Sequence, residues 1–218
     1  MPVLRMSLGG SNNATLPPAI QGQITSSQRY FADFETYLVA LHGFALVVDA
    51  SVSGPASSYR PGDFVALGCK QSAEQWIWEP SATVALLTKN ISPPLAFLER
   101  RPCEQPPAHE TLKLGALDAL LYNFGQALAT NFYERNLPQL KARFGAGSQS
   151  WPAVWDFGRV VRNAMSHGGK ITFTNSNAPA VTWRNMSYSP ADNGRQILHT
   201  DLWPGDLFNL ILDMDATM

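Results

Sequence analysis

The feature that most constrains the fold is a long apolar stripe in residues 31–48, whose members recur at spacings of three and four. They are Phe31, Phe34, Leu38, Leu41, Ala45 and Val48, with Tyr30, Tyr37 and Phe44 in a row beside them. This period is that of an α-helix, and so wide a stripe is typical of a helix that packs on several sides. We therefore predict a bundle helix here, capped at Ser26 or Ser27.

Three later segments show the same helical period. Residues 111–134 carry an apolar face, and a short basic continuation over 137–144 follows an expected break at Asn136-Leu137-Pro138. Trp151-Pro152 opens a third helix that runs to about Ser166, since proline is tolerated in a first turn, and Gly168-Gly169 ends it. The last amphipathic helix carries Leu207, Leu210, Ile211 and Met214.

Residues 50–110 give the least regular pattern and hold eight of the sixteen prolines. Two apolar runs there, 64–68 and 83–88, are too short for their period to separate a strand from a helix. We expect one helix within 73–90, with Pro80 near one of its ends. Three short extended pieces, at 170–174, 180–183 and 195–199, are separated by turn clusters.

These patterns predict a mainly α protein: an up-and-down helical bundle with a small β element, at about 170–199, before the last helix. Residues 1–24 are rich in Gly, Ser, Asn and Pro, so we expect a mobile N-terminal arm. Residues 25–218 then form one domain, large enough to bury a core without disulfide or metal support.

Charge and cysteine content narrow the class of protein. Sixteen Lys and Arg against seventeen Asp and Glu give a net charge of −1, which excludes a generally basic coat but allows a local basic face. Cys69 and Cys103 lack zinc-ligand spacing and are too few for a disulfide framework. The N-terminus lacks the apolar core of a signal peptide, and the most apolar stretch, 37–50, is shorter than a membrane span. We expect a cytoplasmic protein without membrane association.

The residues suited to chemistry gather in segment 155–169. At 100° per residue, the polar side chains of the third helix share one face, opposite the apolar ones. They are Asp156, Arg159, Arg162, Asn163, Ser166 and His167. The helix dipole favours a protonated imidazole at this end by about 0.3–1 kcal/mol. An imidazole beside guanidinium groups suits proton transfer on a phosphodiester, with the arginines holding the phosphate.

The run Arg162-Asn163-x3-His167 resembles the R-x4-6-H signature of HEPN-domain proteins, in which a polar residue, often Asn, follows the Arg. The resemblance implies a four- or five-helix bundle that dimerises so that two such motifs face each other. Many active members are metal-independent endoribonucleases of toxin–antitoxin and phage-defence systems. A homodimer, an RNA substrate and an antitoxin or other protein partner are therefore expected, with no cofactor.

Carried over to this chain, the resemblance makes Arg162 the contact to the scissile phosphate and His167 the general acid or base. Asn163 would orient the substrate or the histidine, and attack by the RNA 2′-hydroxyl would leave a cyclic phosphate. Arg159, Ser166 and Lys170 are the expected substrate-binding residues. The alternative is a non-catalytic dimeric module that binds a partner protein or a nucleotide.

The charged and aromatic residues around the motif allow either RNA binding or a role that does not involve RNA. Residues 135–195 carry eight Lys and Arg but two Asp, a net of +6, which suits RNA, a solvated face or an acidic partner. Trp183 and Tyr188 either stack on bases or pack the β element onto the bundle. Of the other histidines, His42 is expected in the core, His109 lies in a proline-rich loop and His199 ends a predicted strand.

Overall fold

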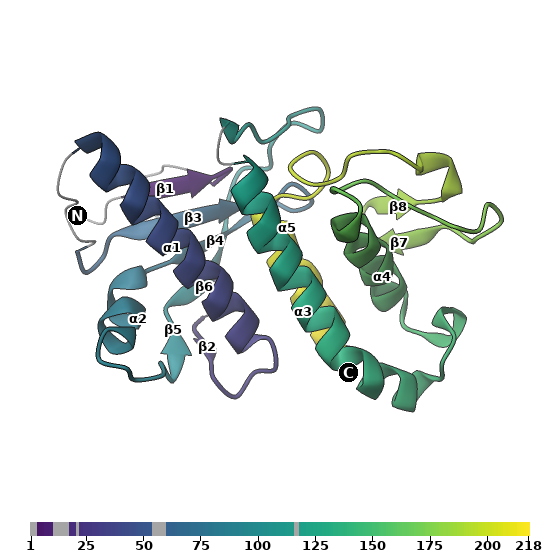
Figure 1. Cartoon of the computed structure of the whole chain (residues 1–218), viewed down its shortest axis with the longest axis horizontal. Coiled ribbons are helices and arrows are strands. Elements are labelled where there is room, and N and C mark those ends of the chain that lie inside the picture. The colour runs from purple at the N-terminus through teal and green to yellow at the C-terminus, as the bar shows by residue number, and fades with distance from the viewer. Residues whose placement is uncertain (1–3, 11–17, 21, 54–59, 116–117) are drawn as a thin grey trace.

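A four-stranded mixed sheet forms the N-terminal side of the molecule (Figure 1). The computed structural model describes residues 4–10, 18–20, 22–53, 60–115 and 118–218. The strands lie in the order β1 (Leu4–Leu8), β3 (Phe64–Gly68), β4 (Glu74–Trp78) and β6 (Leu98–Pro102). β1 and β3 are parallel, and the other two pairs are antiparallel. Beside this sheet, β2 (Ile24–Thr25) pairs with β5 (Leu95–Ala96).

Two helices bury one face of this sheet. α1 (Phe31–Ser53) and α5 (Pro204–Asp215) meet where Phe34 stacks on Phe208, with ring centroids 4.1 Å apart. Trp76 of β4 lies edge-on to both rings and is fully buried. α2 (Pro80–Leu87) follows β4 directly. The largest aromatic residues of the core therefore join the sheet to helices from both ends of the chain.

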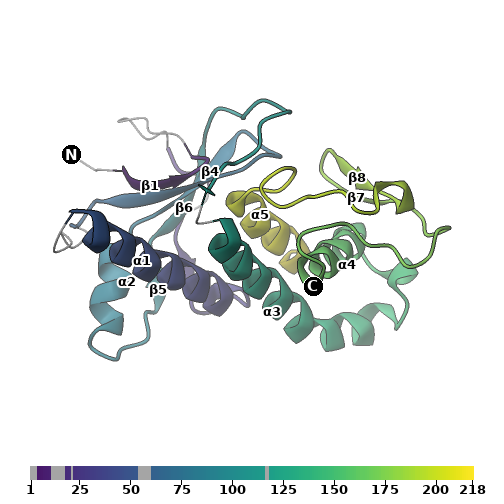
Figure 2. The same ribbon diagram turned by 45° about the horizontal axis from the view of Figure 1, so that its top comes forward.

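The remaining helices extend the core away from the sheet. α3 (Asp118–Phe144) packs on α1, and α4 (Ala153–Ser166) packs on α3 and α5. The hairpin of β7 (Val181–Trp183) and β8 (Met186–Tyr188) covers α4, where Phe157 stacks on Tyr188 at 5.2 Å. Short 3-10 turns occur at Ser148–Ser150 and Pro190–Asp192. Figure 2 shows α4 and the β7–β8 hairpin at the end opposite the sheet, with α5 between the sheet and α4.

The prediction of a mainly α, up-and-down bundle is wrong. The described residues combine five α-helices with a four-stranded mixed sheet and two small two-stranded sheets. β3 is buried at every position, so it lacks the alternation that marks a half-exposed strand. β4 and α2 divide the 73–90 segment, and Pro80 begins the helix as expected near one of its ends. Leu4–Leu8, within the expected arm, forms a strand of the sheet.

Element boundaries differ from the sequence pattern in two helical places. α3 begins at Asp118, seven residues later than expected, and runs through Pro138 without the predicted break. Leu140 is fully buried and Asn136 nearly so, and this packing on both sides of Pro138 outweighs the lost backbone hydrogen bond. The expected small β element is present, but of its three pieces only 180–183 contains a strand, whose partner is β8.

Candidate functional site

α4 carries the polar face predicted from the sequence. Pro152 caps its start, and the helix ends before Gly168 and Gly169, whose backbones have φ of +67° and +80°. Its apolar face is fully buried, and Trp155 Nε1 donates to the Met214 carbonyl at 2.9 Å. A Cβ on Gly158 would lie 2.5 Å from Met214 Sδ, so a larger residue there would require the Met214 side chain to move.

Three predicted site residues, Arg159, Arg162 and Asn163, line one cavity of about 610 Å³, which we call the arginine cavity. Nη2 of Arg162 lies 2.5 Å from Oε1 of Glu134 on α3, and its Nη1 donates to Asn163 Oδ1 at 3.2 Å. Nε of Arg159 pairs with Asp156 at 2.7 Å. Both arginine side chains are about one-third exposed, at 31% and 34%. Each guanidinium group therefore faces the cavity with one carboxylate partner.

Aromatic and polar groups complete the arginine cavity. Tyr133 and Trp151 line it, and Trp151 Nε1 donates to the Gly145 carbonyl at 2.8 Å. Burial raises the pKa of Tyr133, so its hydroxyl stays protonated at neutral pH. Lys141, which is exposed, and the amide of Asn175 also line the cavity. The lining thus offers cationic donors, amides and ring surfaces within one space.

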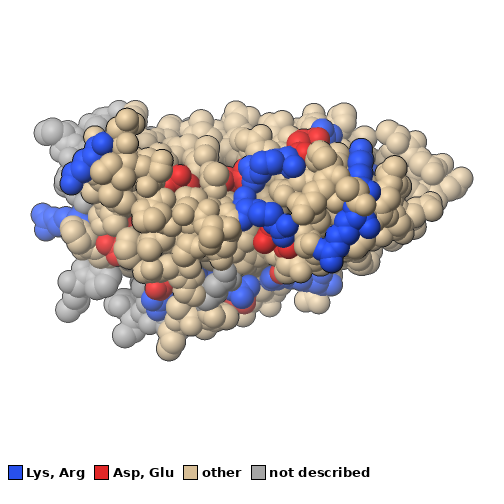
Figure 3. Space-filling model, turned by 90° about the horizontal axis from the view of Figure 1, so that it is seen from below, with Lys and Arg blue, Asp and Glu red and all other residues tan. Residues whose placement is uncertain are grey.

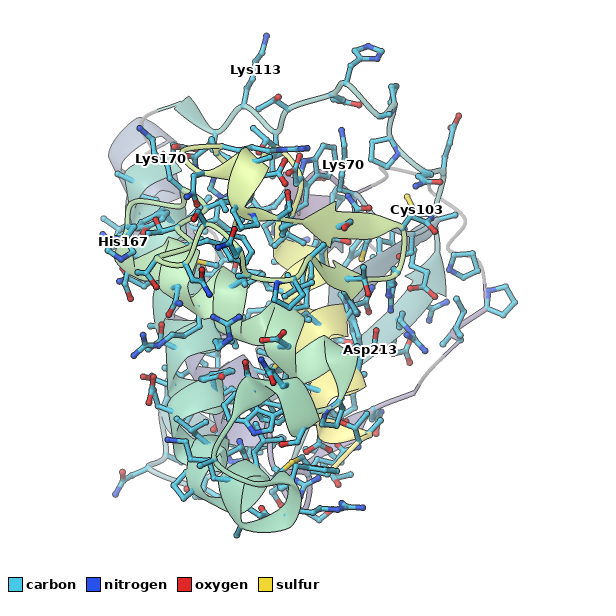
Figure 4. The ribbon with its side chains drawn as sticks, turned by 90° about the vertical axis from the view of Figure 1, so that its right-hand side faces the viewer. Lys70, Cys103, Lys113, His167, Lys170 and Asp213 are labelled. Carbon is cyan, nitrogen blue, oxygen red and sulfur yellow. The ribbon has the colours of Figure 1, made fainter. Side chains whose placement is uncertain are left out.

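The predicted site residues at the end of α4 lie outside the arginine cavity. Ser166, His167 and Lys170 are exposed and do not line it. The His167 N–H closes the helix by donating to the Ala164 carbonyl at 2.9 Å. Figure 4 shows His167 and Lys170 at one edge of the molecule. The structure therefore groups Arg159, Arg162 and Asn163, and separates His167 from them.

The basic segment 135–195 is less basic in space than in sequence. Several of its arginines pair with carboxylates from other parts of the chain. These pairs are Arg135–Asp33, Arg162–Glu134, Arg184–Asp213 and Arg195–Asp201. On the face in Figure 3, Lys and Arg side chains gather in the right-hand part with carboxylates among them. The local field is therefore weaker than the net charge of the segment indicates.

Burial decides the role of the aromatic residues and of one histidine. Trp183 and Tyr188 are buried against Phe157, which confirms that they pack the hairpin onto α4. His42 lies in the core with its ring edge-on to Trp78, at a centroid distance of 5.8 Å, as expected. Burial lowers the pKa of His42 and so favours its neutral form.

A second cavity at the end of α4 contains an ionisable pair that no sequence motif indicates. It has a volume of about 420 Å³ and is lined in part by Asp118, Tyr122, Gly168 and His199; we call it the histidine cavity. Nδ1 of His199 lies 2.8 Å from Oδ1 of Asp118. The two residues are 81 positions apart and neither belongs to a recognisable spacing pattern, so only the fold brings them together.

Neither a family model, nor a curated protein, nor a solved structure matches this chain. Among the residues that the structure describes, no helix combines the length and the apolar character that crossing a bilayer requires. Function is therefore inferred from the two cavities beside α4 and the charges that line them.

Proposed function

We propose that the protein binds single-stranded RNA at the arginine cavity. The observation that carries this proposal is the presence of Arg159 and Arg162, each about one-third exposed, in the lining of one cavity. A guanidinium group binds phosphate through two parallel hydrogen bonds, and two such groups suit a phosphodiester strand. Asn163 adds an amide beside them.

Competition with carboxylates favours this interpretation over a purely structural role for the arginines. A partly exposed ion pair such as Arg162 with Glu134 contributes only about 0–1 kcal/mol, so an incoming phosphate replaces the carboxylate at small cost. The half-buried ring of Trp151 lines the same cavity and offers a surface for base stacking, whereas Tyr133 is buried against Trp155.

The test is binding of a fluorescent single-stranded RNA at several salt concentrations, followed by anisotropy. We expect the double variant Arg159→Ala/Arg162→Ala to bind at least tenfold more weakly. The slope of log affinity against log salt should fall by about 0.7 for each lost phosphate contact. Lys89→Ala, which removes an exposed charge after α2, is the control and should leave both quantities unchanged. Equal loss in control and double variant would overturn the proposal.

RNA cleavage is the second candidate function, and the exposure of His167 at the end of the arginine-bearing helix favours it. The spacing of Arg162-Asn163-x3-His167 is that of HEPN-domain ribonucleases, although this chain does not have the helical bundle that the resemblance implies. In the proposed step, the 2′-oxygen of RNA bonds to phosphorus while the bond to the 5′-oxygen breaks. A proton leaves the 2′-hydroxyl and another joins the 5′-oxygen, giving a 2′,3′-cyclic phosphate. His167 would accept or donate one of these protons.

Cleavage is tested with end-labelled RNA in EDTA. We expect the wild-type protein to release fragments that end in cyclic phosphate, and His167→Ala to be slower by about 10²-fold or more. His109→Ala replaces an exposed loop histidine and should cleave at the wild-type rate. Equal rates for all three proteins would exclude a role of His167, while RNA binding would stand on its own measurement.

The proposal extends to partners. Because His167 lies outside the arginine cavity of its own chain, a homodimer that apposes two α4 helices would supply it with arginines from a second copy. Light scattering at micromolar concentration tests this, and a monomer would overturn it. An antitoxin-like or other protein partner would have to cover the same face and block RNA binding. A cytoplasmic location is part of the proposal, because RNA is present there.

A further inference from the structure

The histidine cavity lies where three segments of the fold meet. The start of α3 contributes Asp118 and Tyr122, and the turn after α4 contributes Gly168. The segment before α5 contributes Gln196 and His199. The Tyr122 hydroxyl donates to the Met165 carbonyl and so joins the start of α3 to the last turn of α4. The cavity is therefore built on two helices packed at their ends.

The backbone of His199 is held in an unusual conformation. Its φ of 60° lies in the left-handed region, which costs a non-glycine residue roughly 1–2 kcal/mol. Its N–H donates to the Leu202 carbonyl at 2.8 Å, and its carbonyl accepts from the Leu112 N–H at 2.7 Å. The same carbonyl accepts from Trp203 Nε1 at 3.2 Å. Three hydrogen bonds thus fix the position from which the imidazole projects.

The imidazole of His199 contacts one carboxylate, that of Asp118, whose side chain is 58% exposed. An ionised carboxylate only accepts hydrogen bonds, so the 2.8 Å contact to Asp118 places the proton of neutral His199 on Nδ1. Nε2 then carries the lone pair and has no hydrogen-bond partner within the described part of the chain. His199 is only 7% exposed, yet it lines the cavity. A buried imidazole with one nitrogen fixed by a carboxylate and the other open is arranged for proton transfer.

We propose that His199 is a catalytic residue of the RNA cleavage proposed above and that Asp118 is its positioning residue; this inference rests on that proposed cleavage. Transesterification needs one group that takes the 2′-hydroxyl proton and another that gives a proton to the departing 5′-oxygen. His199 supplies one of these transfers through Nε2, and His167 supplies the other. The proton taken and the proton given balance, and one imidazole begins neutral while the other begins protonated.

The path of the chain brings both imidazoles to the same end of α4. His167 directly precedes Gly168, which lines the histidine cavity. Lys170 is bridged to Gln196, another residue of the lining, and it adds an exposed ammonium group for the phosphate. A strand held by the arginines of a second copy, as in the homodimer proposed above, would pass both histidines where it crosses the end of α4. This arrangement supplies two proton-transfer groups from one chain.

The first experiment measures cleavage rate against pH for the wild type, His199→Ala, Asp118→Asn and the control His109→Ala. We expect His199→Ala to lose about 10²-fold or more, and the control to match the wild type. Asp118→Asn should lose rate and shift the pH profile, because the imidazole loses its charged partner. Asp118 and Tyr122 are the other titratable groups that line the cavity. An unchanged profile in Asp118→Asn would overturn its positioning role.

The second experiment does not depend on turnover. The His199 imidazole signals are followed by NMR while adenosine 3′-monophosphate, a product analogue, is added. We expect chemical-shift changes of the His199 ring, because a phosphate bound in the histidine cavity would lie beside it. Asp118→Asn should weaken these changes while the melting temperature shows that the variant is folded. Changes at Arg162 without any change at His199 would overturn the inference.

The two failures are distinguishable. If the wild type cleaves RNA and His199→Ala cleaves at the same rate, this inference is wrong and the proposed function stands. If the wild type binds RNA but cleaves none, the proposed cleavage and this inference both fail, and RNA binding remains. If the wild type cleaves and His199→Ala alone is inactive while folded, both are supported.

Discussion

The ionisable side chains that line the two cavities beside α4 are held in different ways. In the arginine cavity, Arg159 and Arg162 are about one-third exposed, and each shares its charge with a carboxylate on a helix surface. In the histidine cavity, His199 is buried, its backbone is fixed by three hydrogen bonds and its Nδ1 is held by Asp118. The arginines can exchange their carboxylate partners. The backbone of His199 is fixed, although the side chain of its partner Asp118 is itself 58% exposed.

This difference suits the arginine cavity to ligand binding and the histidine cavity to proton transfer. Exposed ion pairs are weak and long side chains adjust, so the arginine cavity suits a flexible polyanion whose sequence varies. Proton transfer needs a group held within a fraction of an ångström, and three hydrogen bonds fix the backbone of His199. A sequence motif indicated the flexible region, and only the fold revealed the rigid one.

The largest expected effect is a loss of stability in a variant that disrupts the helix packing on which both cavities depend. Trp155 is fully buried, stacks on Phe132 at 6.0 Å and donates to the Met214 carbonyl. Trp155→Ala should lower the free energy of unfolding by about 3–5 kcal/mol, because it empties the contact between α4, α3 and α5. Urea denaturation followed by circular dichroism measures this.

A milder variant separates the ring from its hydrogen bond. Trp155→Phe keeps most of the ring but leaves the Met214 carbonyl without this donor, so we expect a loss of about 1–2 kcal/mol. A loss below 1 kcal/mol in Trp155→Ala would show that α4 does not depend on this contact for its position.

The helical side of the fold could be predicted because its elements are long and periodic. α1, α4 and α5 follow stripes of spacing three and four, and glycines mark the end of α4. The sheet could not be predicted, because β3 and β4 are five residues each and β3 has no exposed face to give an alternating pattern. The pairing of Leu4–Leu8 with β3 depends on contacts some 60 residues apart.

The candidate site was predictable to the extent that it lies on one helix. The face of α4 follows from 100° per residue, and Arg159, Arg162 and Asn163 do share a cavity. The position of His167 depends on where the helix ends and what packs beside it, which no local pattern specifies. The carboxylate partner of Arg162 comes from α3, and that of Arg159 comes from the preceding turn of α4.

The next largest effect concerns Asp206, which supports the segment that carries His199. Asp206 is fully buried and accepts from the N–H of Trp203 at 2.9 Å, and Trp203 in turn bonds His199. Burial raises the pKa of Asp206 to about 6. Three backbone hydrogen bonds lower this pKa, but their effect is smaller than that of burial. Between about pH 4 and 6 the folded protein therefore holds a proton that the unfolded chain has lost.

The contribution of Asp206 to stability must then fall as the pH rises through this window. A difference of about 2 pKa units corresponds to about 3 kcal/mol, lost between pH 4 and 6 in the wild type. Asp206→Asn should lack this slope, although it is less stable throughout because an amide cannot accept all three bonds. Asp63 and Asp192, whose pKa values are lowered, act below this range. The lowered pKa of His42 and the raised pKa of Glu35 affect wild type and variant alike, so the difference between the two curves isolates Asp206. Parallel curves of wild type and variant from pH 4 to 6 would contradict the prediction.

A smaller effect measures how strongly the backbone of His199 is fixed. Asparagine tolerates a φ of 60° and valine does not, so His199→Val should be about 1–2 kcal/mol less stable than His199→Asn. The amide of His199→Asn can still donate to Asp118, so both variants are made together with Asp118→Ala, and the difference between the two double variants isolates the backbone. RNA affinity at the arginine cavity should be the same in both. Equal stability would mean that the backbone relaxes at this position, and the contrast between a rigid and an adjustable region would weaken.

The smallest effect on stability belongs to the adjustable region. Glu134 is exposed and its bond to Arg162 joins two helix surfaces, so Glu134→Gln should change the free energy of unfolding by no more than about 0.5 kcal/mol. Its effect on RNA affinity should be larger, a gain of about threefold to tenfold, because phosphate no longer competes with a carboxylate for the guanidinium group. Glu104→Gln removes an equal charge from an exposed loop and controls for the change in net charge. Anisotropy titrations at one salt concentration compare the three proteins. The expected gain comes from freeing Arg162 and not from the change in net charge. Equal affinities in the two variants would therefore mean that the pair of Arg162 and Glu134 has only a structural role.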